Sequence, residues 1–445
     1  MPTMQVVMKF GGAALADGGA IRLAVRRVAE QSLRCEAATQ PIVVVSALAG
    51  ITDALESAAR GAAEGRLDPE ALRIRHRSVL SQLELSPELL DRHWRGLSQL
   101  LAGIASSGRL HPPDLDLALS FGERMSARIF AAALVKAGHE AMPVDAWDLG
   151  FVTDSNHGQA RPIEGITVPI RSALSSFPGI AVVTGFLAKD NHGCLTTLGR
   201  NGSDLTASVL AEAVGAEELI FYKDVPGILS ADPRSIPDAR HLDQVTYAEA
   251  AELAFHGARV LHPASVAPAV RARADVRLQS LRDEAEDAGT RLVTRLRREG
   301  PVALAARRSV VRLFFPIELP ERRGEILAAA FARLEALGIS SGPVATDGQG
   351  LTVYVQESPA LDQLQRECTL ERGFSSLALV GHGTGGNRRV LRSALETLAR
   401  EGLTAVGVHC GSRAHAQALV VPQEELQQAS TVLHREILRV PARMS

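Results

Sequence analysis

The sequence contains very little lysine. Lysine occurs only at positions 9, 136, 189 and 223, so arginine supplies 44 of the 48 cationic residues (48 − 4). The compact ammonium of lysine and the planar guanidinium of arginine are not interchangeable where a charge must follow a moving group. In a chain this rich in arginine, each remaining lysine is therefore a candidate for a role that arginine cannot fill.

Cysteine is also scarce, and strong net charge and long apolar runs are missing. The four cysteines, Cys35, Cys194, Cys368 and Cys410, lie far apart without metal-ligand spacing, which predicts reduced thiols rather than disulfides or a zinc site. A formal charge of −2 excludes a strong field for nucleic acid or anionic membrane. No run approaches the roughly 18 apolar residues of a membrane span, and the N-terminus lacks the pattern of a signal peptide. We expect a soluble, cytoplasmic protein with no nucleic-acid or membrane partner.

The 445 residues predict two to four domains, at roughly 100–200 residues per domain. Short β-branched or aromatic runs bounded by turn residues alternate with amphipathic stretches over the first two-thirds of the chain. The expected strands are Val6–Phe10, Ile42–Val45, Ile180–Val183 and Leu219–Tyr222, and the expected helices include Ala20–Arg34, Leu117–Ala137 and Asp204–Val214. This alternation is typical of an α/β fold in which helices enclose a mostly parallel sheet.

The remaining chain divides into segments with different patterns. Residues 69–104 predict a helical insertion, and residues 291–307 are charged and weakly patterned, which favours a linker. Two similar strand-helix-strand modules follow. We therefore predict domains over residues 1–290, 308–372 and 373–445, with residues 291–307 as the linker.

A strand that runs straight into a glycine pair is the first candidate site. Val6–Phe10 precedes Gly11 and Gly12, and glycines at such a turn let backbone N–H groups approach a phosphate. Lys9 would point its ammonium into the same space. A tight turn beside a solvent-facing lysine is the alternative interpretation.

Two later clusters have similar chemistry. Thr197–Asp204 offers two glycines, a helix start and Arg200, which suits bidentate recognition of a carboxylate. The segment Lys223–Arg234 follows a strand with two carboxylates and two cations, which favours a nucleotide or metal nearby. An ordinary capped loop and a plain Pro-Gly turn are the respective alternatives.

These clusters, in this order, resemble the aspartokinases of the amino-acid kinase family. The segments VVVSALAGIT (43–52), SFGERM (120–125) and FHGARVLHP (255–263) add to the resemblance. It implies a three-layer αβα amino-acid kinase domain with a mostly parallel sheet, followed by two βαββαβ ACT-like domains. The implied reaction transfers the γ-phosphoryl group of ATP to the β-carboxylate of L-aspartate, which gives 4-phospho-L-aspartate and begins the aspartate-family amino-acid pathway.

The resemblance also implies a role for each site residue. Lys9 and Asp204 are the expected catalytic residues, and Ser46, Glu123 and Arg200 the expected aspartate ligands. The expected nucleotide-binding residues are Gly11, Gly12, Lys223, Asp224, Arg234 and Arg259. No protein metal ligands are expected, since Mg²⁺ would be held mainly by the phosphates of ATP. The ACT pair implies a homodimer and an amino-acid effector of open identity.

The sequence departs from the family pattern near the phosphates and in the ACT region. Ala13 and Ala14 replace the usual Thr-Ser pair, and Arg259 replaces the usual lysine, so Lys223 is expected to supply a second ammonium. Gly407–Arg413 replaces the family's effector motif, which favours an altered response to lysine or threonine. The alternatives to an active aspartokinase are a catalytically weak homologue that senses an effector, and a kinase for another amino acid.

Overall fold

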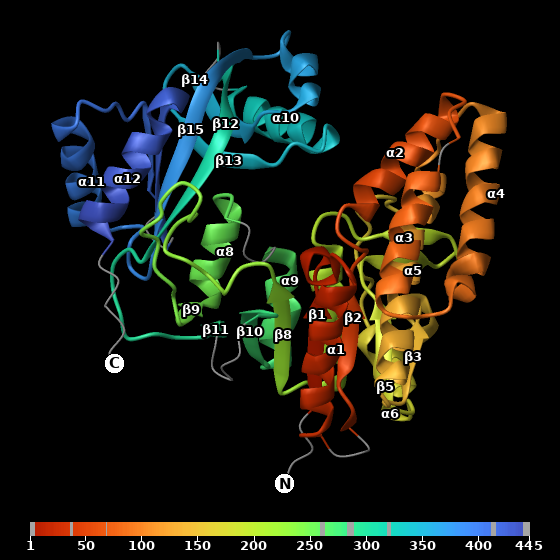
Figure 1. Ribbon diagram of the computed structural model, residues 1–445. Helices are drawn as coiled ribbons and strands as arrows, with labels where there is room; N and C mark the ends of the chain where they lie inside the picture. The colour runs from red at the N-terminus through yellow and green to blue at the C-terminus, as the bar shows by residue number, and fades with distance from the viewer. Residues whose placement is uncertain are drawn as a thin grey trace. The chain divides into compact units, whose positions relative to one another are not determined.

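A computed structural model describes residues 5–35, 39–67, 69–258, 263–282, 289–317, 322–410 and 415–438 (Figure 1). The chain forms two compact units. The first comprises Met1–Gly227 and Leu261–Val293, and the second comprises Ile228–Val260 and Thr294–Ser445. No disulfide joins the four cysteines, all of which lie within the described ranges. Among the described helices, none combines the length and apolar character needed to cross a bilayer.

The first unit contains a mostly parallel sheet with the strand order β3-β5-β2-β1-β8-β10-β11. All neighbouring pairs in this order are parallel except β10 and β11. The strands are β1 (Val6–Phe10), β2 (Ile42–Val45), β3 (Ala141–Val144), β5 (Ile180–Thr184), β8 (Glu218–Lys223), β10 (Asp275–Ser280) and β11 (Thr290–Val293). The strands β1, β2 and β5 are buried along their whole length because helices cover both faces of the sheet.

Helices pack on both faces of this sheet and make a three-layer αβα unit (Figure 1). Alternate residues of β1, namely Val6, Met8 and Phe10, pack into the main apolar core with α1 and α5. The opposite face is covered by a second group of helices. The elements concerned are α1 (Gly18–Ser32) and α5 (Pro112–Lys136) on one face, and α6 (Thr167–Ser175), α7 (Gly202–Val214) and α9 (Pro263–Ala272) on the other. This arrangement confirms the predicted fold class.

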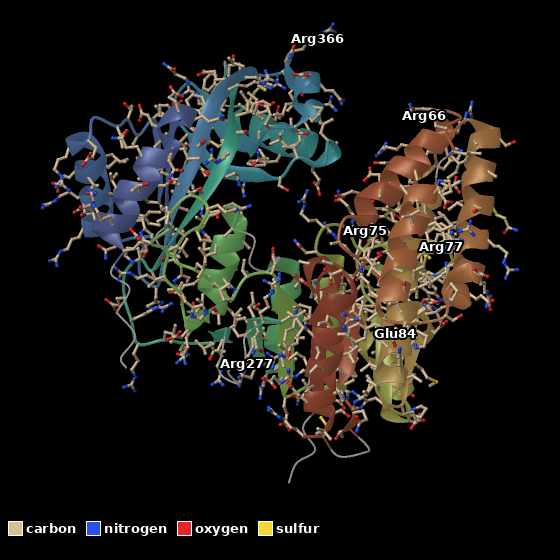
Figure 2. The ribbon with its side chains drawn as sticks, in the orientation of Figure 1. Arg66, Arg75, Arg77, Glu84, Arg277 and Arg366 are labelled. Atoms are coloured by element: carbon tan, nitrogen blue, oxygen red, sulfur yellow. The ribbon has the colours of Figure 1, made fainter. Side chains whose placement is uncertain are left out.

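The predicted helical insertion at residues 69–104 corresponds to α3 and α4, which belong to a larger helical group that begins at α2 and packs on α5. This group comprises α2 (Ile51–Ala63), α3 (Glu70–Gln82), the 3₁₀ turn Pro87–Leu90 and α4 (Asp91–Ser107). Leucine and valine side chains at helical spacing join the main core, while Arg75 and Arg77 of α3 are exposed (Figure 2). Part of the arginine excess therefore lies on solvent-facing helix surfaces.

A small sheet of very short strands lies beside the main one in the first unit. Its order is β4-β6-β7, with β4 (Val152–Thr153), β6 (Leu187–Asp190) and β7 (Leu195–Thr197). None of these strands was predicted, because runs of two to four residues carry no readable period. Their position matters because β7 leads into the start of α7.

The second unit contains one six-stranded antiparallel sheet with the order β13-β14-β12-β15-β17-β16. The strands are β12 (Ala303–Pro316), β13 (Ser341–Thr346), β14 (Gly350–Gln356), β15 (Thr369–Val380), β16 (Gly407–Cys410) and β17 (Ala416–Pro422). Helix α10 (Arg323–Ala336) packs into an apolar cluster with β14. Helices α11 (Arg388–Arg400) and α12 (Leu426–Ile437) pack into a second apolar cluster with β17. Both ACT-like modules therefore share one sheet.

The two modules are nested rather than strictly consecutive. In β12, Ala303–Arg307 pair with Ser376–Val380 of β15, whereas Val310–Pro316 pair with β14. Ser309, with φ of +53°, lies at the register shift between these halves. Residues 303–307, expected in the linker, thus form the first strand of the C-terminal module.

The second unit also contains a segment from the middle of the chain, Ile228–Val260. It carries β9 (Gln244–Thr246) and α8 (Tyr247–Phe255). Ala231 and Ile236 join the apolar cluster of α11 and α12, and the buried Ser230 hydroxyl lies 2.8 Å from Nε2 of His434. This segment therefore completes the core of the C-terminal module.

Candidate functional site

The predicted glycine turn lies at the carboxyl ends of the central parallel strands, where α/β sheets bind ligands. β1 ends at Phe10, and Gly11 and Gly12 lead into a 3₁₀ turn. A Cβ on Gly12 would lie 3.3 Å from the Ala47 carbonyl oxygen, so a side chain there would crowd the turn that follows β2. The Ser46 N–H donates to the Phe10 carbonyl oxygen at 3.1 Å, which holds the two turns side by side.

Two lysines converge on one buried carboxylate at this edge. The register pairs Lys9 with Phe221 on the neighbouring strand, so Lys9 and Lys223, two residues later, face the same side of the sheet. Lys9 Nζ lies 2.6 Å from Oδ1 of Asp204, and Lys223 Nζ lies 3.1 Å from Oδ2. Asp204 is 2% exposed in the first turn of α7. The two cations are thus held together by one anion.

The burial of this cluster changes the protonation behaviour of its members. Burial lowers the pKa of Lys9, and the nearby Lys223 lowers it further against the opposing effect of Asp204. Burial alone would raise the pKa of Asp204, but Lys9 and Lys223 outweigh it and bring the pKa to about 2. Asp204 therefore stays ionised and keeps both ammonium groups in place.

Glu123 supplies a second buried carboxyl group from α5. It is 3% exposed, and its Oε1 accepts the Ala47 N–H at 3.1 Å while Oε2 has no hydrogen-bond partner among the described residues. Burial raises the pKa of Glu123 to about 8, although the Ala47 bond opposes this. Gly122 allows the close approach, since a Cβ there would lie 2.8 Å from the Ala47 Cβ. An incoming cation would satisfy the unpaired oxygen.

The start of α7 is shaped by an unusual backbone conformation. Asn201 caps the helix with φ of +60°, as expected for a residue that tolerates the left-handed region. Arg200, directly before it, is exposed, and its side chain forms no hydrogen bond or ion pair with another described residue. Its guanidinium is therefore available to a ligand.

The other predicted site residues differ in burial and in the unit to which they belong. Ser46 is half-buried at the end of β2, and Asp224 is exposed beside Lys223. Arg234 belongs to the second unit, where it pairs with Asp232 at 2.8 Å. Arg259 lies outside the described residues. The structure thus brings together Lys9, Lys223 and Asp204, with the glycine turn alongside.

One expected donor is already in use. The Gly11 N–H donates to the Tyr222 carbonyl oxygen at 3.3 Å, within the β1–β8 pairing, whereas the Gly12 N–H has no partner among the described residues. Gly12 is therefore the better candidate to donate to a phosphate. The bond from the Ala47 N–H to Glu123 could not be predicted from the sequence, because a backbone donor carries no signal in residue type.

The described residues contain no group of three or more histidine, cysteine, aspartate or glutamate side chains that could hold a metal ion. Both oxygens of Asp204 are occupied by lysines. In kinase sites Mg²⁺ is bound by one or two carboxylates together with substrate phosphates. With Asp204 engaged by two lysines, the nucleotide phosphates would have to supply most of its ligands.

Comparisons with known proteins agree with this geometry. A model of the amino acid kinase family matches residues 4–280. Lysine-sensitive aspartokinase 3 of Escherichia coli (strain K12) is 30% identical over 459 residues, which cover 97% of this chain and 99% of that protein. Aspartokinase 2, chloroplastic, of Arabidopsis thaliana is 30% identical over 460 residues, which cover 96% of this chain and 83% of the relative.

A solved structure matches nearly the whole chain. The crystal structure of E. coli aspartokinase III in complex with aspartate and ADP has a TM-score of 0.82 and 29% identity, covering 97% of this chain and 99% of that one. The family match, the full-length relatives and the shared architecture confirm the resemblance found in the motifs. The chain belongs to the amino acid kinase family and, within it, to the aspartokinases.

Proposed function

We propose that this protein is an aspartate kinase, which converts L-aspartate and ATP into 4-phospho-L-aspartate and ADP at the start of the aspartate-family amino-acid pathway. The observation that carries the proposal is the buried Lys9–Asp204–Lys223 cluster beside the glycine turn at the carboxyl edge of the sheet. The full-length similarity to aspartokinases, one of them in complex with aspartate and ADP, supports the same reaction.

The chemistry needs positioned charge rather than a general base. A β-carboxylate with an ordinary pKa near 3.9 is already ionised at neutral pH. One of its oxygens attacks the γ-phosphorus, the bond to the β–γ bridging oxygen breaks, and ADP leaves with that electron pair without any proton transfer. Catalysis then consists of bringing two anions together and stabilising the charge on the transferring group.

The residues divide into two sets around this reaction. Lys9 stabilises the transferring phosphoryl group, Gly12 donates its N–H, and Asp204 fixes the positions of Lys9 and Lys223. Arg200 binds the α-carboxylate of aspartate, Glu123 its ammonium group, and Ser46 helps to hold it. Asp224, Arg234 and Arg259 are proposed to contact the nucleotide, together with Gly11.

We also propose that ATP binds as its Mg²⁺ complex. When bound, Mg²⁺ would neutralise charge on the β- and γ-phosphate oxygens. Lys9, Lys223 and the Gly12 N–H would contact the remaining phosphate oxygens. The reaction is proposed to take place in the cytoplasm, as expected from four cysteines without disulfide spacing.

The second unit is proposed to bind an amino-acid effector and to form a homodimer. The lysine sensitivity named for the E. coli relative makes lysine the first candidate. The replaced motif at 407–413, of which residues 411–413 lie outside the described part, favours a weaker or different response. Rates at millimolar lysine, threonine and both together measure this response.

Hydroxylamine trapping tests the function directly. Purified protein with ATP, Mg²⁺ and L-aspartate should give aspartyl hydroxamate, and Lys9→Met should abolish it. Hydroxamate formed only with another amino acid would identify a different kinase. No turnover with any amino acid, combined with intact effector binding, would identify a regulatory homologue.

A further inference from the structure

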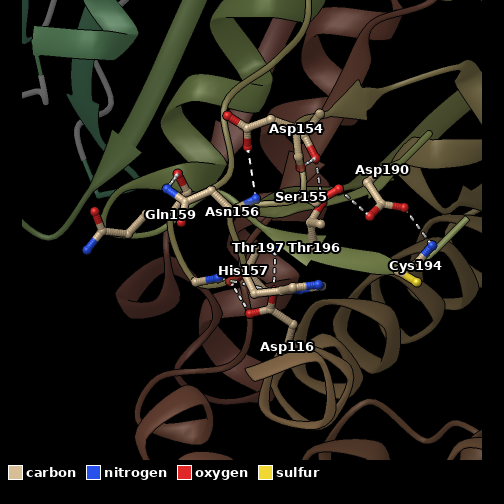
Figure 3. Close-up of polar contacts among 12 residues, drawn as sticks. Asp116, Asp154, Ser155, Asn156, His157, Gln159, Asp190, Cys194, Thr196 and Thr197 are labelled. Atoms are coloured by element: carbon tan, nitrogen blue, oxygen red, sulfur yellow. Dashed lines mark hydrogen bonds and ion pairs between the residues drawn. The ribbon is translucent and has the colours of Figure 1, made fainter. Parts of the chain in front are cut away.

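A second buried carboxylate, Asp116, lies outside the lysine cluster and has a dense set of partners. It is 1% exposed on α5, seven residues before Glu123 and so nearly on the same helix face. Its Oδ2 lies 2.8 Å from Nδ1 of His157 and accepts the Gly158 N–H at 3.1 Å and the Thr197 N–H at 3.2 Å. Its Oδ1 accepts the Thr197 hydroxyl at 2.6 Å (Figure 3).

These partners belong to two segments that are themselves joined. The Ala160 N–H donates to the Thr197 carbonyl oxygen at 2.9 Å. A Cβ on Gly199, whose φ is +72°, would lie only 3.0 Å from the Gly158 carbonyl oxygen. The 157–160 loop and the end of β7 therefore form one packed structure, which Asp116 ties to α5.

This structure leads directly into the loop that carries Arg200. Thr197 is three residues before Arg200, and the intervening Leu198 N–H donates to the Phe186 carbonyl oxygen at 2.9 Å. The Arg200 side chain is exposed and has no described partner of its own. Its position is therefore set by the backbone on either side. Asp116 holds the preceding side at Thr197, and the ion pairs of Asp204 hold the following side in α7.

We propose that Asp116 is a positioning residue for the aspartate subsite. By holding both donors of Thr197, it fixes the backbone that presents Arg200 to the α-carboxylate of the substrate. The nucleotide side is held separately by Lys9, Lys223 and Asp204, so the loss of Asp116 affects aspartate more than ATP. The inference rests on the proposed function, since it assumes that Arg200 binds aspartate.

Asp116→Asn in the full-length protein is the primary test. An amide at this position accepts with one atom only, and its NH₂ group opposes the N–H and hydroxyl donors that face it. The KM for aspartate should rise at least tenfold, while the KM for ATP and kcat should each stay within about threefold. Equal rises in both KM values, or no change in either, would overturn the proposal.

Variants of the partner residue separate positioning from general stability. Thr197→Ser keeps both donors and should retain the wild-type KM for aspartate, whereas Thr197→Val keeps the shape but loses the hydroxyl and should raise it. The double variant Asp116→Asn/Thr197→Val should be no worse than Asp116→Asn alone, because both remove the same bond. Independent, multiplying effects would contradict the assignment.

Asp190 provides a matched control in the same small sheet. It is also buried and accepts hydrogen bonds from the Ser155 hydroxyl at 2.8 Å and the Cys194 N–H at 2.9 Å (Figure 3). The His192 N–H donates to it as well, at 2.9 Å. These donors lie before β7, the nearest of them, Cys194, six residues before Arg200, and none bonds to Thr197 or to the loop after it. Asp190→Asn should leave the KM for aspartate unchanged, and a rise equal to that of Asp116→Asn would reject the specific role.

Hydrogen exchange makes the test independent of activity. Asp116→Asn should speed amide exchange in residues 198–202, and Asp190→Asn should not. If wild-type protein forms no aspartyl hydroxamate, the proposed function fails, yet this exchange difference would still decide whether Asp116 holds the loop. Unchanged exchange in Asp116→Asn would reject the positioning role.

Discussion

At the scale of single residues, the four lysines lie in three distinct environments. Lys9 and Lys223 bind Asp204 in the first unit. Lys136 donates to the carbonyl oxygens of Leu83 and Glu84 at the end of α3, and to the Glu84 carboxylate at 2.6 Å (Glu84 is labelled in Figure 2). Lys189 lies 5.0 Å from the centre of the Trp147 ring. Lys136 and Lys189 thus have local structural partners outside the Asp204 cluster.

Lys223→Ala should lower kcat and raise the KM for ATP. The substitution removes one of two ammonium groups from a site where charge stabilisation dominates, and it leaves Oδ2 of Asp204 without that cation. We expect a combined loss in kcat/KM for ATP of about 10- to 100-fold. Steady-state kinetics measure this loss, with Lys136→Ala as the control that keeps wild-type values. Unchanged kinetics in Lys223→Ala would exclude it from the phosphate site.

The pH dependence of aspartate binding should follow Glu123. Since burial raises the pKa of Glu123 to about 8, most of this group is protonated at pH 6.5 and cannot attract an ammonium ion. Rising pH ionises it, so the KM for aspartate should fall between pH 6.5 and 8, by up to about tenfold per unit. Initial rates at varied aspartate give the profile.

Glu123→Gln serves as the control for this profile. A glutamine has no charge to gain, so its KM for aspartate should be high and flat over the same pH range. The wild-type slope in this variant would assign the pH dependence to another group.

At the scale of elements, the start of α7 determines the geometry of the site. It carries Asp204, follows the Arg200 loop and packs closely against the end of β5. A Cβ on Gly185, directly after β5, would lie 2.5 Å from the Ser203 Cβ. No flexible side-chain tip can relieve this contact, so α7 can approach β5 only if residue 185 is glycine.

Gly185→Ala should therefore displace the first turn of α7 and separate Asp204 from its lysines. We expect a loss in kcat of at least about tenfold, because small displacements of reacting groups are costly, and a destabilisation of about 1–3 kcal/mol from overpacking. Thermal unfolding and steady-state kinetics measure the two effects. Gly103→Ala in α4, where a Cβ meets nothing within 4 Å, is the matched control with full activity. Full activity in Gly185→Ala would show that α7 tolerates the shift.

Sequence reasoning succeeded for elements with a strong local pattern. Val6–Phe10 and Ile42–Val45 agree to the residue with the prediction, because a glycine directly follows the first run and a proline directly precedes the second. It failed for residues 303–307, where the small Ala-Leu-Ala-Ala run has no strand-like alternation. Asp116 was missed because its partners lie 41 and 81 residues further along the chain, and only the folded structure brings them together.

At the scale of the whole molecule, the second unit is assembled from separate stretches of chain. Its sheet begins at Ala303, and its core also contains Ala231 and Ile236. Glu249 on α8 is completely buried, pairs with Arg298 at 3.1 Å and accepts the His382 N–H at 3.1 Å. The segment Ile228–Val260, which directly follows the Lys223 turn, is therefore held by the ACT-like sheet.

His434→Ala should loosen this segment although the two are far apart in sequence. The substitution removes the bond between the buried Ser230 hydroxyl and His434, leaves the Arg240 N–H as the remaining partner of that hydroxyl, and opens space beside it. Hydrogen exchange should become faster in residues 228–242 as well as in α12. His409→Ala, exposed on β16 of the same unit, should change neither region. Exchange that increases in α12 alone would mean that the segment is held by other contacts.

The distance between Ser230 and His434 also has a consequence for synthesis. The two residues are 204 positions apart, so at about 5–20 residues per second the ribosome needs roughly 10–40 s to make the second after the first. For most of that time Ala231 and Ile236 have no apolar partners from α11 or α12. The nascent chain therefore exposes this segment until translation is almost finished, which makes it a natural contact for chaperones and an early site of aggregation when synthesis stops short of α12.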